Sequence, residues 1–115
     1  NTQVVLLGDS LTELGNWGEL LARRCRGPLH NHGHSGFTSA NGRSIVGRPP
    51  VSELAGLLAT VWFGANDATD ARLNPRQHVP LPAFRRNLAA ILRAVRARFR
   101  HVVVLAPPAI DEPKY

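Results

Sequence analysis

Three short apolar segments, each closed by a glycine or a proline, constrain the fold of this chain more than any other feature. They are residues 3–7 before Gly8, residues 58–63 before Gly64, and residues 101–106 before Pro107. These runs are rich in β-branched residues, and their central positions are almost all apolar, which is typical of strands buried on both faces. Such strands predict a parallel sheet that is covered by helices on both sides.

The first two strands are separated by an amphipathic pattern. Apolar residues recur three or four positions apart, at Leu14, Trp17, Leu21 and Cys25, until the pair at 27–28, Gly-Pro, interrupts them. This spacing predicts a helix. The following residues, 28–34, are short enough for a second strand.

The later part of the chain contains one obscure region and one clear helix. Residues 38–58 show no period because glycines and a proline pair interrupt it, although residues 51–58 fit a helix. From Leu81 onward the apolar residues fall within an arc of about 100° on a helical projection. The residues of this arc are Phe84, Leu88, Ile91, Leu92, Val95 and Phe99.

Strands that alternate with helices predict a doubly wound α/β fold. We expect four parallel strands in the order 2-1-3-4, with helices on both faces and the fourth strand at an unprotected edge. With 115 residues the chain has the size of one domain, which we place at residues 1–115. Because an open edge can pair with another chain, we expect the isolated protein to be poorly stable or to aggregate.

Composition excludes several classes of protein. No apolar run approaches the roughly 20 residues of a membrane span, and the single cysteine, Cys25, excludes an internal disulfide framework. The start lacks the layout of a signal peptide, which favours an intracellular location. The chain begins at Asn1 and contains no methionine, which indicates a fragment whose N-terminus is missing. We make no prediction of its oligomeric state.

The net charge of +6 raises the question of nucleic-acid binding. A second arc on the last helix carries arginines at positions 85, 86, 93, 96 and 100. This arc is either a polyanion-binding stripe or a solvated helix face. We favour solvent, because the arginines of the chain are scattered and do not alternate with aromatic residues.

Polar residues follow the first three strands at the point where each ends. These segments are Gly8-Asp9-Ser10, Gly33-His34-Ser35-Gly36 and Gly64-Ala65-Asn66-Asp67. In open parallel sheets, ligands bind beyond the carboxyl ends of the strands. The sequence therefore predicts a site where these three loops meet.

The same segments resemble the sequence blocks of the SGNH or GDSL hydrolases, and in particular the branch of isoamyl acetate-hydrolysing esterases. The matching segments are Gly8-Asp9-Ser10-Leu11-Thr12-Glu13, Asn31-His32-Gly33-His34-Ser35-Gly36, Phe63-Gly64-Ala65-Asn66-Asp67, Gln77-His78-Val79-Pro80-Leu81 and Pro107-Pro108. The resemblance implies a flavodoxin-like, three-layer α/β/α hydrolase fold that is truncated here after the fourth strand.

The resemblance also implies roles for individual residues. Ser10 would be the nucleophile that forms an acyl-enzyme with a small-molecule ester. The backbone N–H groups of Ser10 and Gly36 and the side-chain amide of Asn66 would form the oxyanion hole. No metal or cofactor is implied. His78 would have a structural or pocket-lining use.

Each of these residues also has a purely structural interpretation. Ser10 and Glu13 fit an S-x-x-E capping box, Gly36 fits an ordinary turn, and Asn66-Asp67 fits an Asx turn. We interpret Asp9 and Asp67 as structural acceptors for loop amides.

The three histidines of the second strand, His30, His32 and His34, alternate along it and would share one face. That arrangement suits a metal ion, but we favour partly exposed strand residues, because no carboxylate or cysteine lies near them in the sequence. Their role stays open.

Two departures from the family limit the functional hypothesis. Family members carry an Asp-x-x-His pair near the C-terminus, which supplies the base for the serine. Here the only late acids are Asp111 and Glu112, and no histidine follows His101. A catalytically inactive binding module with the same fold therefore remains an alternative, and a basic nucleic-acid-binding surface a second one. The segment after Gly36 also differs from that of the esterase branch, so acyl and alcohol preferences do not follow from the sequence.

Overall fold

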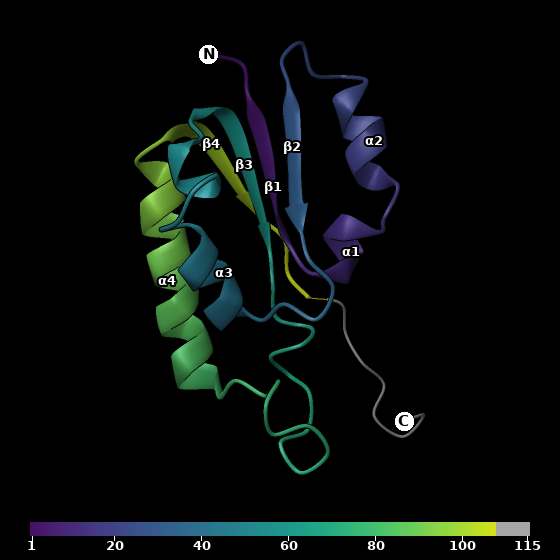
Figure 1. The fold of residues 1–115 in the computed structure, drawn as a ribbon, viewed down its shortest axis with the longest axis vertical. Coiled ribbons are helices and arrows are strands. Elements are labelled where there is room, and N and C mark those ends of the chain that lie inside the picture. The colour runs from purple at the N-terminus through teal and green to yellow at the C-terminus, as the bar shows by residue number, and fades with distance from the viewer. Residues whose placement is uncertain (108–115) are drawn as a thin grey trace.

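The computed structural model describes residues 1–107, which form one parallel sheet between two layers of helices (Figure 1). The strands are β1 (Val4–Gly8), β2 (Leu29–Gly33), β3 (Gly56–Trp62) and β4 (Phe99–Val104). Their order is β2-β1-β3-β4 and every pairing is parallel, which confirms the predicted sheet. Pro108, Asp111 and Glu112 lie outside the described residues.

The helices divide between the two faces of the sheet (Figure 1). Two short helices, α1 (Ser10–Glu13) and α2 (Trp17–Ala22), lie on one side. On the other side α3 (Ser39–Ile45) packs against α4 (Leu81–Arg96). A short 3-10 helix, η1 (Val51–Glu53), precedes β3. The three-layer α/β/α arrangement is confirmed.

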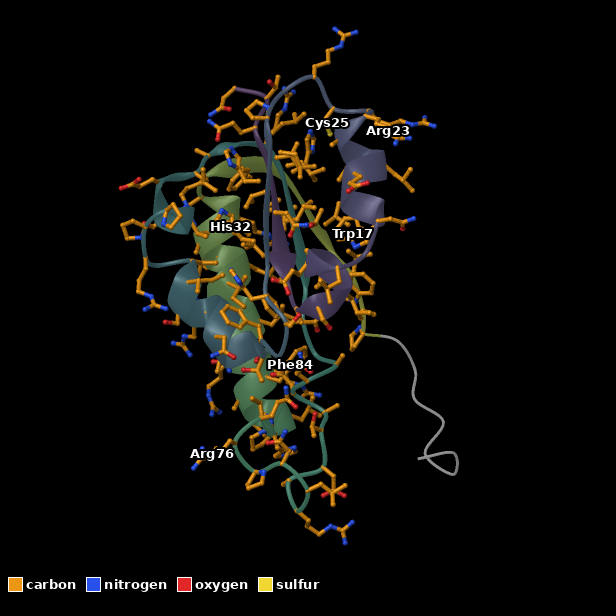
Figure 2. All side chains as sticks on the ribbon, turned by 45° about the vertical axis from the view of Figure 1, so that its right-hand side comes forward. Trp17, Arg23, Cys25, His32, Arg76 and Phe84 are labelled. Atoms are coloured by element: carbon orange, nitrogen blue, oxygen red, sulfur yellow. The ribbon has the colours of Figure 1, made fainter. Side chains whose placement is uncertain are left out.

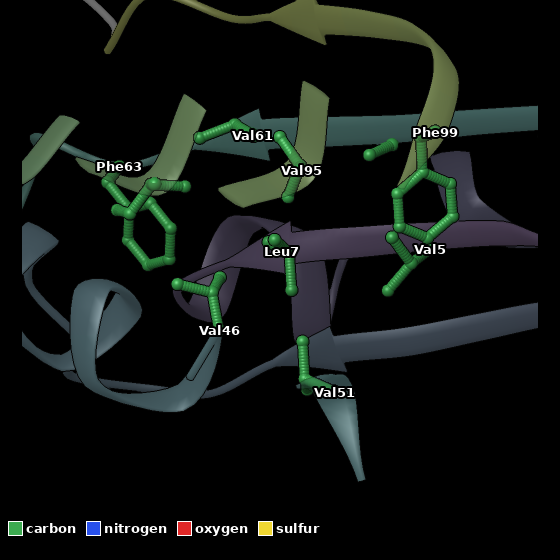
Figure 3. Close-up of a cluster of buried hydrophobic side chains, with 10 residues drawn as sticks. Val5, Leu7, Val46, Val51, Val61, Phe63, Val95 and Phe99 are labelled. Atoms are coloured by element: carbon green, nitrogen blue, oxygen red, sulfur yellow. The ribbon is translucent and has the colours of Figure 1, made fainter. Parts of the chain in front are cut away.

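The main hydrophobic core lies between the sheet and the α3–α4 layer (Figure 3). Alternate residues of β1, Val5 and Leu7, point into it and meet Ile91 and Val95 of α4. All four of these side chains are at most 1% exposed. The other residues of β1 are equally buried against the opposite layer, as expected for a strand covered on both faces.

The predicted helix over residues 14–25 is wrong in its extent. Leu14 ends α1 as its C-cap and is 75% exposed, and α2 begins only at Trp17. Gly15 and Asn16 separate the two helices, and both residue types are poor helix formers. The spacing of apolar residues thus continues from one helix to the next, across the turn that separates them.

Two other expectations are also corrected. Residues 51–58 do not form a helix, because the 3-10 turn η1 ends at Glu53 and the chain enters β3 at Gly56. Phe99 and Arg100 belong to β4 rather than to the last helix, which ends at Arg96. Phe99 is nevertheless buried in the core.

The strand register brings the carboxyl ends of the central strands level. Gly8, the last residue of β1, pairs with Gly33 on one side and with Trp62 on the other. The loops that follow β1, β2 and β3 therefore leave the sheet at the same edge (Figure 1).

A pair of tryptophans joins α2 to the sheet near this edge. The rings of Trp17 and Trp62 meet edge to face with centroids 6.0 Å apart. The indole N–H of Trp17 donates to the carbonyl of Leu11, and that of Trp62 donates to the carbonyl of Ala106.

A buried polar network fixes the loop after β3 against α3. The carboxylate of Asp67 accepts hydrogen bonds from the N–H and the hydroxyl of Ser39, the first residue of α3. The amide of Asn87, on α4, donates to the same hydroxyl at 3.1 Å. Asp67 is 3% exposed and Ser39 is fully buried. Asp67 is thus a structural acceptor, as predicted, but the amide that it binds belongs to the start of α3 and not to a loop.

None of the helices among residues 1–107 has the length and apolar character needed to cross a membrane.

The close packing of α3 against Phe63 and α4 gives a first prediction. A Cβ on Gly42 would lie 2.6 Å from the Phe63 ring and 3.1 Å from Ile91. Replacing glycine by alanine inside a helix gains about 1 kcal/mol of propensity, but overpacking a core costs about 1–3 kcal/mol. The difference is a net loss, and we expect Gly42→Ala to lower the free energy of unfolding by up to about 2 kcal/mol in urea titrations. Gly47→Ala is the matched control, because its Cβ would meet nothing closer than 3.8 Å. Equal stability of the two variants would contradict this packing.

The buried carboxylate gives a second prediction. Asp67→Ala would leave the N–H and hydroxyl of Ser39 without their acceptor, and each unsatisfied buried group costs about 1–3 kcal/mol. Two such groups predict a loss of about 2–6 kcal/mol in the free energy of unfolding, measured by denaturant titration. Asp70→Ala in the same loop is the control, because Asp70 is exposed and, among residues 1–107, its side chain is hydrogen-bonded only to Arg72. It should leave the midpoint unchanged, and a similar loss in both variants would refute the assignment.

Candidate active site

The first component of the site is Ser10, directly after β1. The N-cap of α1 is Asp9, whose carboxylate accepts from the N–H of Leu11 at 2.9 Å. This confirms Asp9 as a structural acceptor. The alternative interpretation of Ser10 as a helix cap is wrong, because Asp9 takes that position. Within residues 1–107, no hydrogen bond uses the N–H or the hydroxyl of Ser10.

Glu13, the other residue of the suspected capping box, turns to a different partner. Its carboxylate accepts from the N–H of Ser35 at 3.1 Å and from the Ser35 hydroxyl at 2.6 Å. These hydrogen bonds, with a smaller contribution from the charge of His34, lower the pKa of Glu13. This contact leaves no local pattern in the sequence, because it joins residues 22 positions apart.

The second component is the turn after β2. The N–H of His34 donates to the carbonyl of Gly8 at 3.0 Å, and this holds the turn beside the end of β1. Gly36 has φ of +82°, a conformation that side-chain-bearing residues rarely adopt. Among the hydrogen bonds of the described chain, none involves the N–H of Gly36.

The third component is Asn66, in the loop after β3. Its side-chain amide donates to the carbonyl of Phe37 at 2.9 Å, which places Asn66 against the second turn. An amide nitrogen carries two hydrogens. One is used to fix the orientation of the side chain, and the other is left for a further acceptor.

Three uncommitted N–H donors lie on the loops at this edge of the sheet: the backbone N–H groups of Ser10 and Gly36 and the side-chain amide of Asn66. Ser10 and Asn66 are half-buried, and Gly36 is exposed, so solvent and small molecules have access. Neutral donors of this kind stabilise a developing negative charge on oxygen. The predicted oxyanion-hole roles of Ser10, Gly36 and Asn66 remain a hypothesis at this point.

An apolar cavity of about 290 Å³ adjoins the loop that carries Asn66. Its lining residues are Gly64, Asp67, Ala68, His78, Val79, Leu81, Phe84 and Pro107. His78 lines this cavity, and its ring nitrogen Nδ1 lies 2.7 Å from the carbonyl oxygen of Thr69. The implied use of His78 in structure and in lining a pocket agrees with both contacts.

The histidines of β2 lie on the α3 side of the sheet. His30 pairs with Val5 and contacts Gln3 at 3.1 Å, and His32 pairs with Leu7. Burial, and then the charges of His34 and His30, lower the pKa of His32. Over residues 1–107, no three histidine, cysteine or acidic side chains cluster in a way that could hold a metal ion.

Comparison with known proteins finds a family model and close relatives. Residues 6–115 match the model of the GDSL-like lipase/acylhydrolase family. The isoamyl acetate-hydrolyzing esterase 1 homolog of Rattus norvegicus is 37% identical, and the match covers 96% of this chain and 49% of that protein. The GDSL esterase/lipase At5g45920 of Arabidopsis thaliana is 36% identical over 96% of this chain and 52% of its own length. The chain thus spans about half the length of the curated relatives it matches.

Solved structures share the fold. The α/β hydrolase LAE5 from the metagenome of Lake Arreo in Spain aligns with a TM-score of 0.76 at 21% identity, covering 96% of this chain and 62% of that one. The acetylxylan esterase Axe2 of Geobacillus stearothermophilus aligns with a TM-score of 0.73 at 15% identity, over 90% of this chain and 58% of its own. Catalytic mutants of that esterase replace a serine, an aspartate or a histidine by alanine.

The family match extends over almost the whole chain and includes all three loops of the candidate site. Relatives above 30% identity cover the same residues. The chain therefore belongs to the GDSL-like lipase/acylhydrolase family.

Proposed function

We propose that the protein to which this chain belongs hydrolyses carboxylic esters of small molecules, with Ser10 as the nucleophile. The hydroxyl oxygen of Ser10 bonds to the ester carbonyl carbon while a base takes its proton. The tetrahedral intermediate then expels the alcohol, which receives that proton, and leaves an acyl group on Ser10. Water attacks the acyl-enzyme in the same manner, which releases the carboxylic acid and regenerates the serine.

The observation that carries this proposal is the set of uncommitted donors beside Ser10. The N–H groups of Ser10 and Gly36 and one hydrogen of the Asn66 amide have no partner among the described residues. Unpaired donors held on ordered backbone are what an oxyanion hole requires, because they need no reorganisation when the negative charge forms.

Two further observations favour small, largely apolar esters. The cavity beside the Asn66 loop has almost entirely apolar walls and a volume of about 290 Å³, which suits a short alkyl group. The mammalian relatives are named as homologs of an isoamyl acetate-hydrolyzing esterase, and isoamyl acetate is an ester of a small acid and a small apolar alcohol.

The general base is the component that the described residues do not supply. Between residues 1 and 107 no histidine is hydrogen-bonded to the hydroxyl of Ser10. Serine at its ordinary pKa is a weak nucleophile without such a partner. We propose that an aspartate and a histidine in the half of the family fold not spanned by this chain activate Ser10. The catalytic aspartate and histidine of the Geobacillus esterase are three positions apart, which matches the Asp-x-x-His spacing.

Removal of one oxyanion donor gives a third prediction. In a form of the protein that includes the Asp-x-x-His segment, we expect Asn66→Ala to lower kcat on p-nitrophenyl acetate by about 10²- to 10³-fold. Asn16→Ala is the matched control, because Asn16 is exposed and its side chain makes no capping hydrogen bond to α2, and it should retain kcat within about threefold. Full activity of Asn66→Ala would remove Asn66 from the oxyanion hole.

The activity of the chain itself gives a fourth prediction. Because Ser10 has no base among the described residues, we expect the 115-residue chain to hydrolyse p-nitrophenyl acetate at close to the background rate. The longer form should hydrolyse it and lose that activity on Ser10→Ala. Robust hydrolysis by the short chain that disappears on Ser10→Ala would instead assign the base to a residue of this chain, with His34 the first to test. A longer form without esterase activity would favour the binding-module alternative.

A further inference from the structure

The loop between β3 and α4 reaches back to the turn that carries Gly36, and a single side chain makes the connection. The side-chain nitrogen Nε2 of Gln77 donates to the carbonyl oxygen of Gly36 at 3.2 Å. The two residues are 41 positions apart in the sequence. Gln77 is half-buried at this junction.

The orientation of the Gln77 amide is set from its other end. Its oxygen Oε1 accepts from the hydroxyl of Thr69 and from the side-chain amide of Asn74, both at 3.2 Å. Because the carbonyl of Gly36 can only accept, while Thr69 and Asn74 can both donate, the end of the amide that faces Gly36 is the nitrogen and the opposite end is the oxygen. The nitrogen is therefore directed at Gly36. The loop has a defined shape of its own, since the N–H groups of Gln77 and His78 both donate to the carbonyl of Asn74.

The hydrogen bond from Gln77 restrains the backbone of the turn at Gly36, where it is least restricted. A glycine at φ of +82° has no side chain to restrict its backbone, so the peptide planes on either side of it rotate easily. Before Gly36, the N–H of Ser35 is held by Glu13. After Gly36, its own carbonyl is held by Gln77. The uncommitted N–H of Gly36 lies between these two fixed points.

We propose that Gln77 is a positioning residue of the oxyanion hole, which holds the carbonyl of Gly36 and so restricts rotation of the preceding peptide plane, whose N–H is directed at the developing negative charge. This inference rests on the proposed ester hydrolysis at Ser10. Gln77 acts through Gly36 and does not touch the reacting atoms. Because transition-state stabilisation depends on donor geometry to within a fraction of an ångström, loss of this hydrogen bond lowers kcat more than it raises KM.

The test compares two substitutions in a form of the protein that includes the Asp-x-x-His segment. Gln77→Leu removes both ends of the amide. Gln77→Glu keeps the length and the acceptor oxygen for Thr69 and Asn74, but places an oxygen without a hydrogen against the carbonyl of Gly36. We expect both variants to lower kcat on p-nitrophenyl acetate by about 10- to 100-fold with KM within about threefold, which is less than the loss of an oxyanion donor itself.

The matched control is Arg76→Ala. Arg76 is the neighbouring residue, is exposed, and extends from the loop into solvent (Figure 2). It should retain kcat and KM within about twofold. Thermal unfolding of all variants checks that the fold is intact. The Gln77 variants should unfold within a few degrees of the unmodified protein, since the hydrogen bonds of the Gln77 side chain are exposed or only partly buried and contribute little to stability.

The outcomes separate this inference from the function on which it rests. If Ser10→Ala retains activity, the proposed function fails. If Ser10→Ala is inactive but Gln77→Glu retains the kcat of the unmodified protein, the function stands and the role of Gln77 is refuted. A rise in KM at unchanged kcat would also refute it, because that result assigns Gln77 to substrate binding.

Discussion

The arrangement of the site depends on the hydrogen bonds between the buried carboxylate of Asp67 and Ser39. The carboxylate ties the loop after β3 to the first residue of α3 through the N–H of Ser39 at 2.9 Å. Neither the turn at Gly36 nor the loop at Asn66 belongs to a strand or helix, so nothing in the secondary structure fixes their separation. Because the carboxylate is shielded from water, its hydrogen bonds hold with little competition from solvent. The contact between Asn66 and Phe37 then forms across loops that are already held together.

The sheet could be predicted from the sequence because its strands are defined by local composition. The uninterrupted apolar runs of β1 and β3 fit a buried parallel strand and little else. The order of the strands is that of the flavodoxin-like fold, which the family resemblance implied. Helix boundaries could not be predicted in the same way. Phe99 continues the apolar arc of α4 and is buried, but it enters the core from the first position of β4. Arg98 lies between α4 and β4, and its guanidinium donates to the carbonyls of Val46, Val51 and Leu54. Because these partners are distant in the sequence, the contacts leave no local pattern that would mark the end of the helix.

The same distinction holds for the site: the positions of its residues could be predicted from the local sequence, but their contacts with residues distant in the sequence could not. The positions of Ser10, Gly36 and Asn66 after their strands followed from glycine and polar residues at three strand ends, together with a family resemblance. The contacts that orient those residues did not follow from the sequence. Glu13 fits a capping box in the sequence, yet it binds Ser35 because Asp9 already caps the helix. The segment that contains Gln77 is recognisable as a motif, but nothing in it indicates that the side chain reaches Gly36.

The contact between Trp17 and Trp62 makes the two helical layers distinguishable by spectroscopy. These are the only tryptophans in the chain, and their rings are 6.0 Å apart. Tryptophan fluorescence therefore originates at one location, where α2 meets the face of the sheet opposite the α3–α4 core. Far-ultraviolet circular dichroism, in contrast, is dominated by the 16 residues of α4 on the other face. Unfolding curves recorded by the two signals coincide only if both layers leave the sheet in one cooperative step.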